Sequence, residues 1–263
     1  MENSAVIDSL SELQATSFAR DGYLVLKHLT SVAACGAIRD WAELASRDMH
    51  APLEYETDVQ YPGAPDNFNA VGGKTSRRLL NVYSRDEIIR RWATSQTLLG
   101  PLQQLLAADD IVLSQCHHNC LMTKFPGYSS ATLWHQDNRY WSFDRQDLIS
   151  AWLALGSENK ENGCLKVIPG THQMDIEEGR FDAKKFLRPD LPINRELIDQ
   201  AIDVELEAGD LLLFHSRLFH AAGRNESDRV KMSLVFSYHS ADNAPIMDTR
   251  SARYPGITLH KVS

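Results

Sequence analysis

A histidine and an aspartate stand two residues apart in the stretch WHQDNRY, residues 134–140. Alternate side chains of a β-strand point to the same face, so the imidazole of His135 and the carboxylate of Asp137 could reach one point in space. Such a point can hold a metal ion. Taken alone the pattern is weak, because HQD also arises by chance among ordinary surface residues.

A second strand-like segment, GDLLLFHSRLFH, ends at His220. Together with His135 and Asp137, this residue would place two imidazoles and one carboxylate on one face of a metal, which is the ligand set of non-haem Fe(II) oxygenases. Three coordination positions would then stay open for O2 and an electron-donating cosubstrate. His220 could therefore complete an Fe(II) centre with His135 and Asp137.

The segment after His220 offers cations for such a cosubstrate. 2-Oxoglutarate would chelate the metal through its keto-acid end, and its distal carboxylate would need a positive partner. Arg229 and Lys231 are two residues apart, so alternation predicts that they share a face of the strand. Arginine would supply a bidentate fork and lysine a point charge.

Three ordered stretches carry a family resemblance: WHQDNRYWSFDRQDLISAWLAL, ENGCLKVIPGTHQ and GDLLLFHSRLFHAAGRN. They resemble the phytanoyl-CoA dioxygenase family of Fe(II)- and 2-oxoglutarate-dependent oxygenases, and FARDGYLVLKHL is similar to the start of that family's domain. The resemblance covers most of the chain. It implies a double-stranded β-helix (a cupin-like jelly roll), with His135, Asp137 and His220 as iron ligands and Trp152 beside the cosubstrate.

Two positions depart from the family pattern. Members typically carry an arginine eleven residues after the distal histidine, where this chain has Lys231, so Arg229 is an alternative anchor for 2-oxoglutarate. Ala222 stands where some members place a serine that binds the same carboxylate. His215 competes for the role of third ligand, but it lies five residues before His220 and would face the other way on a regular strand.

The implied activity is hydroxylation of a C–H bond in a small organic metabolite, with release of succinate and CO2; desaturation and ring formation stay open. Asp137 argues against the halogenating relatives, which carry a small residue at that position. Two alternatives remain: a jelly-roll metalloenzyme that does not use 2-oxoglutarate, and a non-catalytic relative that only binds ligand. No basic cluster suited to the phosphates of an acyl-CoA is visible in the sequence.

Neighbouring residues are weaker candidates. His117 and His118 adjoin a strand that should pass the interior, so one of them could face the pocket. Cys116 and Cys120 beside them form a weak zinc pattern without a CxxC pair. Arg139 is a candidate to meet an anionic substrate, and the aromatic residues around the HQD stretch suit packing or a substrate wall.

The first part of the chain is expected to be helical. Periodic apolar residues predict a helix from about residue 10 that stops at Asp21-Gly22 and leads into a strand over 23–26. Further helices are predicted over 31–48 and 86–106, the latter interrupted at Gly100-Pro101. Residues 51–75 are rich in Pro, Gly, Asp and Asn, which predicts one long loop of the kind that often forms a lid.

After about residue 110, short apolar runs alternate with turn residues, which favours a jelly roll over a parallel sheet. Residues 175–205 read as a charged insertion. We expect one domain over 1–263, mainly β with flanking helices, with a helix-rich part to about 110 and the β-helix core over about 111–245.

Composition excludes several classes of protein. The net charge of −8 and the lack of a basic block predict no binding to nucleic acid. The absence of a signal-like start or a long apolar run predicts a cytoplasmic protein without membrane partners. The four cysteines are expected to be buried thiols. Oligomeric state cannot be read from the sequence.

Overall fold

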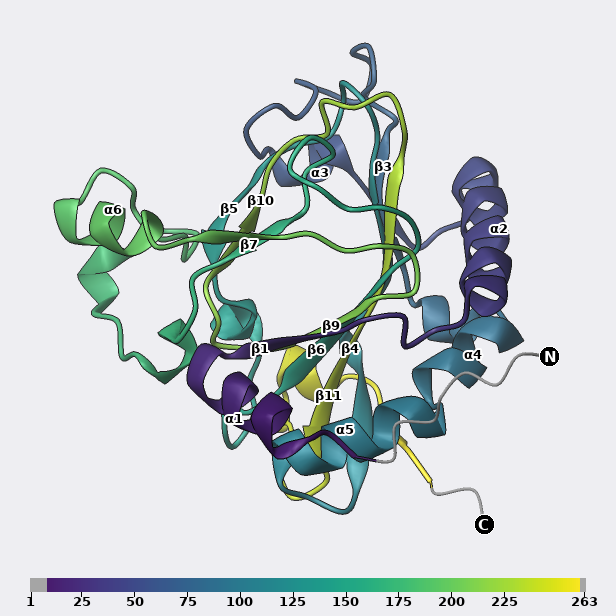
Figure 1. Cartoon of the computed structure of the whole chain (residues 1–263). Helices are drawn as coiled ribbons and strands as arrows, with labels where there is room; N and C mark the ends of the chain where they lie inside the picture. Colours follow the sequence, from purple (N-terminus) through teal and green to yellow (C-terminus); the bar gives the residue numbers. More distant parts are fainter. Residues whose placement is uncertain (1–8, 261–263) are drawn as a thin grey trace.

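The computed structural model describes residues 9–260. Two antiparallel sheets enclose the centre of the molecule, and the main helices lie outside the larger sheet (Figure 1). The expected mainly-β jelly roll is confirmed. The strands are β1 (Tyr23–Leu26), β2 (Leu53–Tyr55), β3 (Ser76–Leu80), β4 (Ile111–Lys124), β5 (Thr132–His135), β6 (Ile149–Ala154), β7 (Leu165–Val167), β8 (Ile202–Val204), β9 (Leu211–His215), β10 (His220–Ala222), β11 (Lys231–Ser240) and β12 (Ile257–Thr258).

The α-helices are α1 (Glu12–Asp21), α2 (Val32–Asp48), α3 (Glu56–Val59), α4 (Glu87–Ala93), α5 (Gln96–Leu106) and α6 (Pro192–Ile198). Short 3₁₀ turns are η1 (Val82–Ser84), η2 (Asp137–Tyr140), η3 (Thr171–Gln173), η4 (Glu178–Arg180) and η5 (Arg250–Ala252). The larger sheet has the order β1-β9-β6-β11-β4-β3-β2 with β12 on β4, and the smaller sheet has the order β5-β10-β7-β8.

Side-chain alternation divides the larger sheet into two faces. In β11, Met232, Leu234, Phe236 and Tyr238 join the main hydrophobic core, which also contains apolar residues of α1, α2, α4 and α5. The alternate positions of the same strand point to the interior between the sheets and begin with Lys231. The helices therefore cover one face, and the other face is left for a site.

Strand β4 contains an interruption in its pairing with β11. Phe236 pairs with Asn119 while the adjacent Ser237 pairs with Ser114, so residues 115–118 have no partners in β11. Bulges of this kind bend a strand and redirect side chains, and they are frequent near active sites. His117 and His118 lie in this segment.

Two sequence predictions about the first half are wrong. Residues 51–75 are not one loop, because β2 pairs with β3 and extends the sheet, and α3 follows directly. The helical region 86–106 is broken at Thr94-Ser95 rather than at Gly100-Pro101. Thr94 ends α4 through backbone and side-chain bonds to the Arg90 carbonyl, and the extended Ser95 starts a new helix. Pro101 is accommodated inside α5, where its ring is buried.

The remaining expectations about elements and thiols agree with the structure. The first two helices and strand β1 form where predicted, and all four cysteines are free and buried. Within residues 9–260, no helix is long and apolar enough to cross a bilayer.

The junction between α1 and β1 depends on one glycine. Gly22 ends α1 with φ of +80°, and a Cβ at this position would lie 2.4 Å from Nδ1 of His172. Gly36, inside α2, has no atom within 4 Å of the same hypothetical Cβ. Only the first position therefore requires glycine.

We expect Gly22→Ala to lower the free energy of unfolding by about 1–3 kcal/mol. Alanine is strained in the left-handed backbone conformation of this position, and its Cβ would clash with His172. Gly36→Ala should instead raise it by roughly 0.5–1 kcal/mol, because alanine is the better helix former. Urea unfolding of the two variants measures both values. Equal effects of the two substitutions would contradict this account.

Candidate metal centre

The two histidines of the predicted centre are cross-strand neighbours. β5 and β10 pair antiparallel with His135 directly opposite His220, and their ring centroids are 4.2 Å apart. Residues directly opposite one another in an antiparallel pair have adjacent side chains on the same face. Strand pairing by itself therefore brings together two imidazoles that are 85 residues apart in the sequence.

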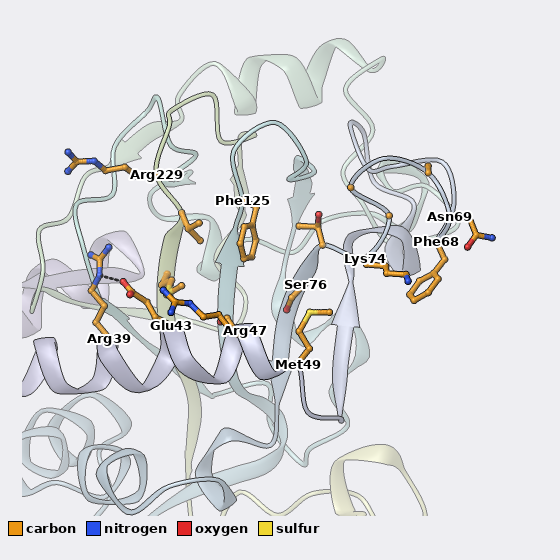
Figure 2. A pocket seen from close by; sticks show the side chains of 17 residues that line it. Arg39, Glu43, Arg47, Met49, Phe68, Asn69, Lys74, Ser76, Phe125 and Arg229 are labelled. Atoms are coloured by element: carbon orange, nitrogen blue, oxygen red, sulfur yellow. Dashed lines mark hydrogen bonds and ion pairs between the residues drawn. The ribbon is translucent and has the colours of Figure 1, made fainter.

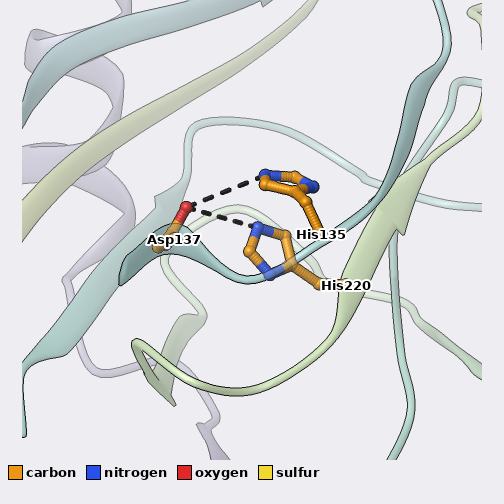
Figure 3. A group of neighbouring side chains, drawn as sticks. All are labelled: His135, Asp137 and His220. Atoms are coloured by element: carbon orange, nitrogen blue, oxygen red, sulfur yellow. Dashed lines mark ion pairs between the residues drawn. The ribbon is translucent and has the colours of Figure 1, made fainter. Parts of the chain in front are cut away.

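Asp137 joins them from the residue that begins η2. Gln136 keeps an extended backbone, so the side chain of Asp137 returns to the side of His135. Its Oδ1 lies 3.8 Å from Nε2 of His135 and 3.6 Å from Nε2 of His220. Figure 3 shows the carboxylate and the two imidazoles directed toward one point. The hydroxyl of Ser150 donates to Oδ2 of Asp137 at 3.2 Å.

Backbone hydrogen bonds orient both imidazoles. Nδ1 of His135 lies 2.8 Å from the Leu133 carbonyl, and Nδ1 of His220 lies 3.1 Å from the Leu218 carbonyl. A carbonyl can only accept, so each Nδ1 carries a proton and each Nε2 has a free lone pair. Burial, followed by the charges of His220 and Arg139, lowers the pKa of His135 well below its usual range, which keeps that ring neutral.

These three residues have the donors that a divalent transition metal requires. One ligand atom from each lies within 4.8 Å of the other two, and all three residues are buried. Two imidazoles and one carboxylate suit Fe(II) and leave coordination positions open. In the described part of the chain, no other group of three histidine, cysteine or acidic residues is arranged in this way.

His118 lies against this cluster without being part of it. Its Nε2 is 3.4 Å from Oδ1 of Asp137, its Nδ1 is 3.2 Å from the Ser150 hydroxyl, and its ring meets Trp141 edge-on. Burial lowers the pKa of His118 to about 4, partly offset by the charge of Asp137. His117 stacks on Trp141, and both histidines line the cavity described below.

His215 lies outside the cluster. Its Nε2 lies 3.3 Å from Oδ1 of Asp147, and its Nδ1 accepts the backbone N–H of Arg217. Cys120 lines the cavity, whereas Cys116 does not, and neither belongs to the metal-ligand group. The weak zinc pattern seen in the sequence therefore has no counterpart among the described residues.

A cavity of about 340 Å³ contains the cluster and extends between the sheets. Trp152 and Lys231 line it on the side of β6 and β11, and both side chains bond to Glu158, a buried residue beyond the end of β6. The Lys231 ammonium lies 3.0 Å from Oε2 of Glu158, while Trp152 Nε1 and the Ser233 hydroxyl donate to the same carboxylate at 3.1 Å and 2.6 Å.

Lys124 brings a second ammonium to this end of the cavity. It is the β4 partner of Lys231 across the sheet. Its Nζ donates to the carbonyls of Ser130 and Gly223 at 2.8 Å and 2.6 Å, and no carboxylate lies within 4.0 Å of it among the described residues. Burial, and then repulsion from Lys231, lowers the pKa of Lys124 to about 7.

The prediction that Arg229 and Lys231 share a face is wrong. β11 begins only at Lys231, which is buried, whereas Arg229 precedes the strand and is exposed. Arg229 lies at the edge of a separate outer cavity of about 860 Å³ between α2 and the segment 68–76 (Figure 2). Arg39, Arg47 and Lys74 line the same outer cavity, so basic residues from distant segments do gather there.

Several cavity residues were not identified from the sequence. Glu158 and Lys124 have no local motif, and their roles follow only from strand pairing. Arg77 and Arg78 of β3 reach the cavity and bind Glu54, with distances of 2.9 Å and 2.6 Å. The one available signal was the alternation of side chains in β4, because Lys124 stands two and four residues after Met122 and Cys120, which also line the cavity.

Residues 18–233 match the family model described as phytanoyl-CoA dioxygenase (PhyH). The ectoine dioxygenase of Bordetella parapertussis is 26% identical over 90% of this chain and 77% of its own length. The phytanoyl-CoA dioxygenase 1 of Oryza sativa subsp. japonica is 31% identical over 83% of this chain and 85% of its own length.

Solved structures share the fold. EctD from S. alaskensis, crystallised with 2-oxoglutarate and 5-hydroxyectoine, has a TM-score of 0.74 and 21% identity, covering 93% of this chain and 83% of its own. The 2-oxoglutarate-dependent carbocyclase SnoK from nogalamycin biosynthesis has a TM-score of 0.71 and 19% identity, covering 97% of this chain and 94% of its own.

Anaerobic Fe(II) should stabilise the protein against heat, because a ligand that binds only the folded state adds its binding free energy to stability. At a metal concentration one hundred times Kd the gain is about 2.7 kcal/mol, which corresponds to roughly 5–10 °C in Tm for a chain of this size. Asp137→Ala and His220→Ala should remove most of this rise. His215→Ala, a histidine outside the cluster, should retain it; loss of the rise in all three variants would contradict the assignment.

Proposed function

Because the chain belongs to the phytanoyl-CoA dioxygenase family, we propose that it is an Fe(II)- and 2-oxoglutarate-dependent oxygenase that hydroxylates a C–H bond of a small organic molecule. The observation that carries this proposal is the convergence of His135, Asp137 and His220 on one point inside the cavity. The orientation of both imidazoles by backbone carbonyls supports it, because their lone pairs face that point before any metal arrives.

The donor set fits the metal that the proposal requires. His135 and His220 would each bind through Nε2 and Asp137 through Oδ1, while the Ser150 hydroxyl holds the second oxygen of the carboxylate. When bound, Fe(II) with 2-oxoglutarate and O2 supplies the oxidising power for C–H hydroxylation, with succinate and CO2 as coproducts. The protein contributes the geometry of the ligands, a largely enclosed site and the placement of the substrate.

Lys231 and Lys124 are suited to hold the distal carboxylate of 2-oxoglutarate. An ammonium has three N–H donors. Lys231 uses two of them on Glu158 and Ser233, and Lys124 uses two on backbone carbonyls. Each lysine thus keeps one donor for the two oxygens of a carboxylate. Arg229 has no access to this end of the cavity, so the proposal assigns the anchor to Lys231, with Lys124 as its partner.

Trp152 would line the same subsite. Its ring lies 5.0 Å from the Lys231 ammonium, and its indole N–H is occupied by Glu158. Trp152 therefore fixes Glu158, and Glu158 in turn fixes Lys231. The Glu158 carboxylate thus compensates the charge of the Lys231 ammonium, which would be costly to bury without a partner.

The proposed function is tested by adding Fe(II) and 2-oxoglutarate to the protein in air and measuring succinate. We expect succinate that depends on both additions, with His135→Ala and Asp137→Ala at least about a hundredfold slower. Product formation from an organic substrate without any 2-oxoglutarate would favour a different jelly-roll metalloenzyme. Ligand binding with no succinate under any condition would favour a non-catalytic relative.

The lysine anchor is tested by the double variant Lys231→Met/Glu158→Gln, which removes both charges of the buried pair. Removing only one partner would leave the other charge buried without compensation. Loss of a charge-assisted hydrogen bond costs about 1.5–3 kcal/mol, so the 2-oxoglutarate concentration for half-maximal turnover should rise roughly tenfold or more. Arg229→Met serves as the control and should leave that concentration unchanged. The reverse order of effects would move the anchor to Arg229.

Binding of 2-oxoglutarate should weaken as pH rises from 6.5 to 8.5. The pKa of Lys124 is lowered to about 7, so its ammonium is present below that pH and is lost above it in the absence of an anion. A bound carboxylate favours the charged form, so binding takes up a proton in this window. Anaerobic titration calorimetry measures the trend, and Lys124→Gln should flatten it. An equally steep slope in that variant would rule out Lys124 as its source.

A further inference from the structure

The charges that line the metal cavity are unbalanced. Six cationic residues line it, but only three carboxylates do. Glu158, which is paired with Lys231, brings the number of carboxylates to four. The cationic residues are Arg77, Arg78, Lys124, Arg139, Lys231 and Arg250, and the lining carboxylates are Glu54, Glu56 and Asp137. Fe(II) and the 2-oxoglutarate dianion carry equal and opposite charges, so the proposed cofactors leave the excess of two cations in place.

Most of the lining cations already have partners. Arg77 and Arg78 bind Glu54, and the Arg77 guanidinium also lies 4.0 Å from the buried carboxylate of Glu56. Lys231 is paired with Glu158. The proposed function assigns Lys124, together with Lys231, to the distal carboxylate of 2-oxoglutarate, and this carboxylate would be the first anionic partner of Lys124. The excess therefore falls on Arg139 and Arg250.

Arg139 is held in place without a carboxylate. Its guanidinium lies over the rings of Phe186 and Tyr140, with centroid distances of 4.2 Å and 4.9 Å. Its two hydrogen bonds, to the Lys184 carbonyl and the Tyr61 hydroxyl, are both 3.3 Å long. Stacking fixes the plane of an arginine and leaves its charge available to an anion.

Arg250 belongs to η5, is exposed, and lines the same cavity as Arg139. Within residues 9–260, no carboxylate lies within 4.0 Å of its guanidinium or of that of Arg139. The adjacent Ser251 binds Nε2 of His117 at 2.8 Å, which ties this turn to the bulge of β4. Both guanidinium groups belong to residues that line the cavity containing the metal cluster.

We infer that the substrate is a small organic acid, whose carboxylate, phosphonate or phosphate group binds Arg139 and Arg250 while its carbon skeleton lies against Trp141 and Tyr140, near the metal cluster. This inference rests on the proposed function and specifies its substrate class. The cavity volume of about 340 Å³ is near the lower limit for ligand sites and must also hold 2-oxoglutarate, so the enclosed part of the substrate is small.

The test measures binding rather than turnover. Protein saturated with Fe(II) and 2-oxoglutarate is titrated anaerobically with 3-phenylpropionate, 2-phenylethylphosphonate, inorganic phosphate and the neutral 3-phenylpropionamide. We expect the anions to bind at least tenfold more tightly than the amide. The relative affinities of the carboxylate and the phosphonate then distinguish the two kinds of acid.

Arg139→Gln and Arg250→Gln should each weaken anion binding about tenfold and leave the amide unaffected. Arg253→Gln is the matched control, because Arg253 is exposed like Arg250 but lies on Tyr254 and does not line the cavity. The charge reversal Arg250→Glu should shift preference from 3-phenylpropionate toward 3-phenylpropylamine. Equal binding of acid and amide, no saturable anion binding, or unchanged anion binding in both glutamine variants would overturn the inference.

The two proposals fail in different ways. The same titrations on metal-free protein report anion binding that needs no catalytic metal. Arginine-dependent anion binding without succinate formation would remove the proposed function alone. Succinate formation with no effect of charge on substrate binding would remove only the inference about the substrate.

Discussion

The pairing of β5 with β10 is the constraint on which the site depends. It sets His135 opposite His220 with both rings on the inner face, and Asp137 follows within one extended residue. A shift of one residue in this register would turn a histidine to the outer face, because strand side chains alternate. The smaller sheet therefore determines whether a metal can bind, although it contributes little to the main hydrophobic core.

The two faces of the larger sheet differ: the outer face packs against the helices, and the inner face carries polar and charged side chains. The helices pack against its outer face through the apolar positions of β6, β9 and β11. Its inner face carries Lys124, Lys231 and Ser233, which would be costly to bury without partners. Glu158 meets three of the donors there, and backbone carbonyls meet Lys124. The interior is thus polar where a dicarboxylate would bind, and neighbouring groups position its polar side chains before any ligand arrives.

The arginines that line the cavity are held in two different ways. Arg77 and Arg78 are paired with Glu54 and Glu56, whereas Arg139 is positioned by aromatic rings. Two kinds of support therefore occur in one cavity: carboxylates hold structural cations, and rings hold a cation whose charge is still available. The distinction matters because charges in a partly enclosed site interact more strongly than charges in water.

The sequence by itself determined the features that depend on near neighbours. The spacing of His135 and Asp137, the helix predicted over 31–48 and the glycine that ends α1 depend on local sequence. The order of the family motifs along the chain added His220 and the jelly roll. Only the tertiary structure decided the rest. It showed that Arg229 lies before β11 begins, that Glu158 forms an ion pair with Lys231, and that residues 115–118 of β4 do not pair with β11. These outcomes depend on where each strand starts and which strand pairs with it, and such long-range choices are set by the packing of the whole chain.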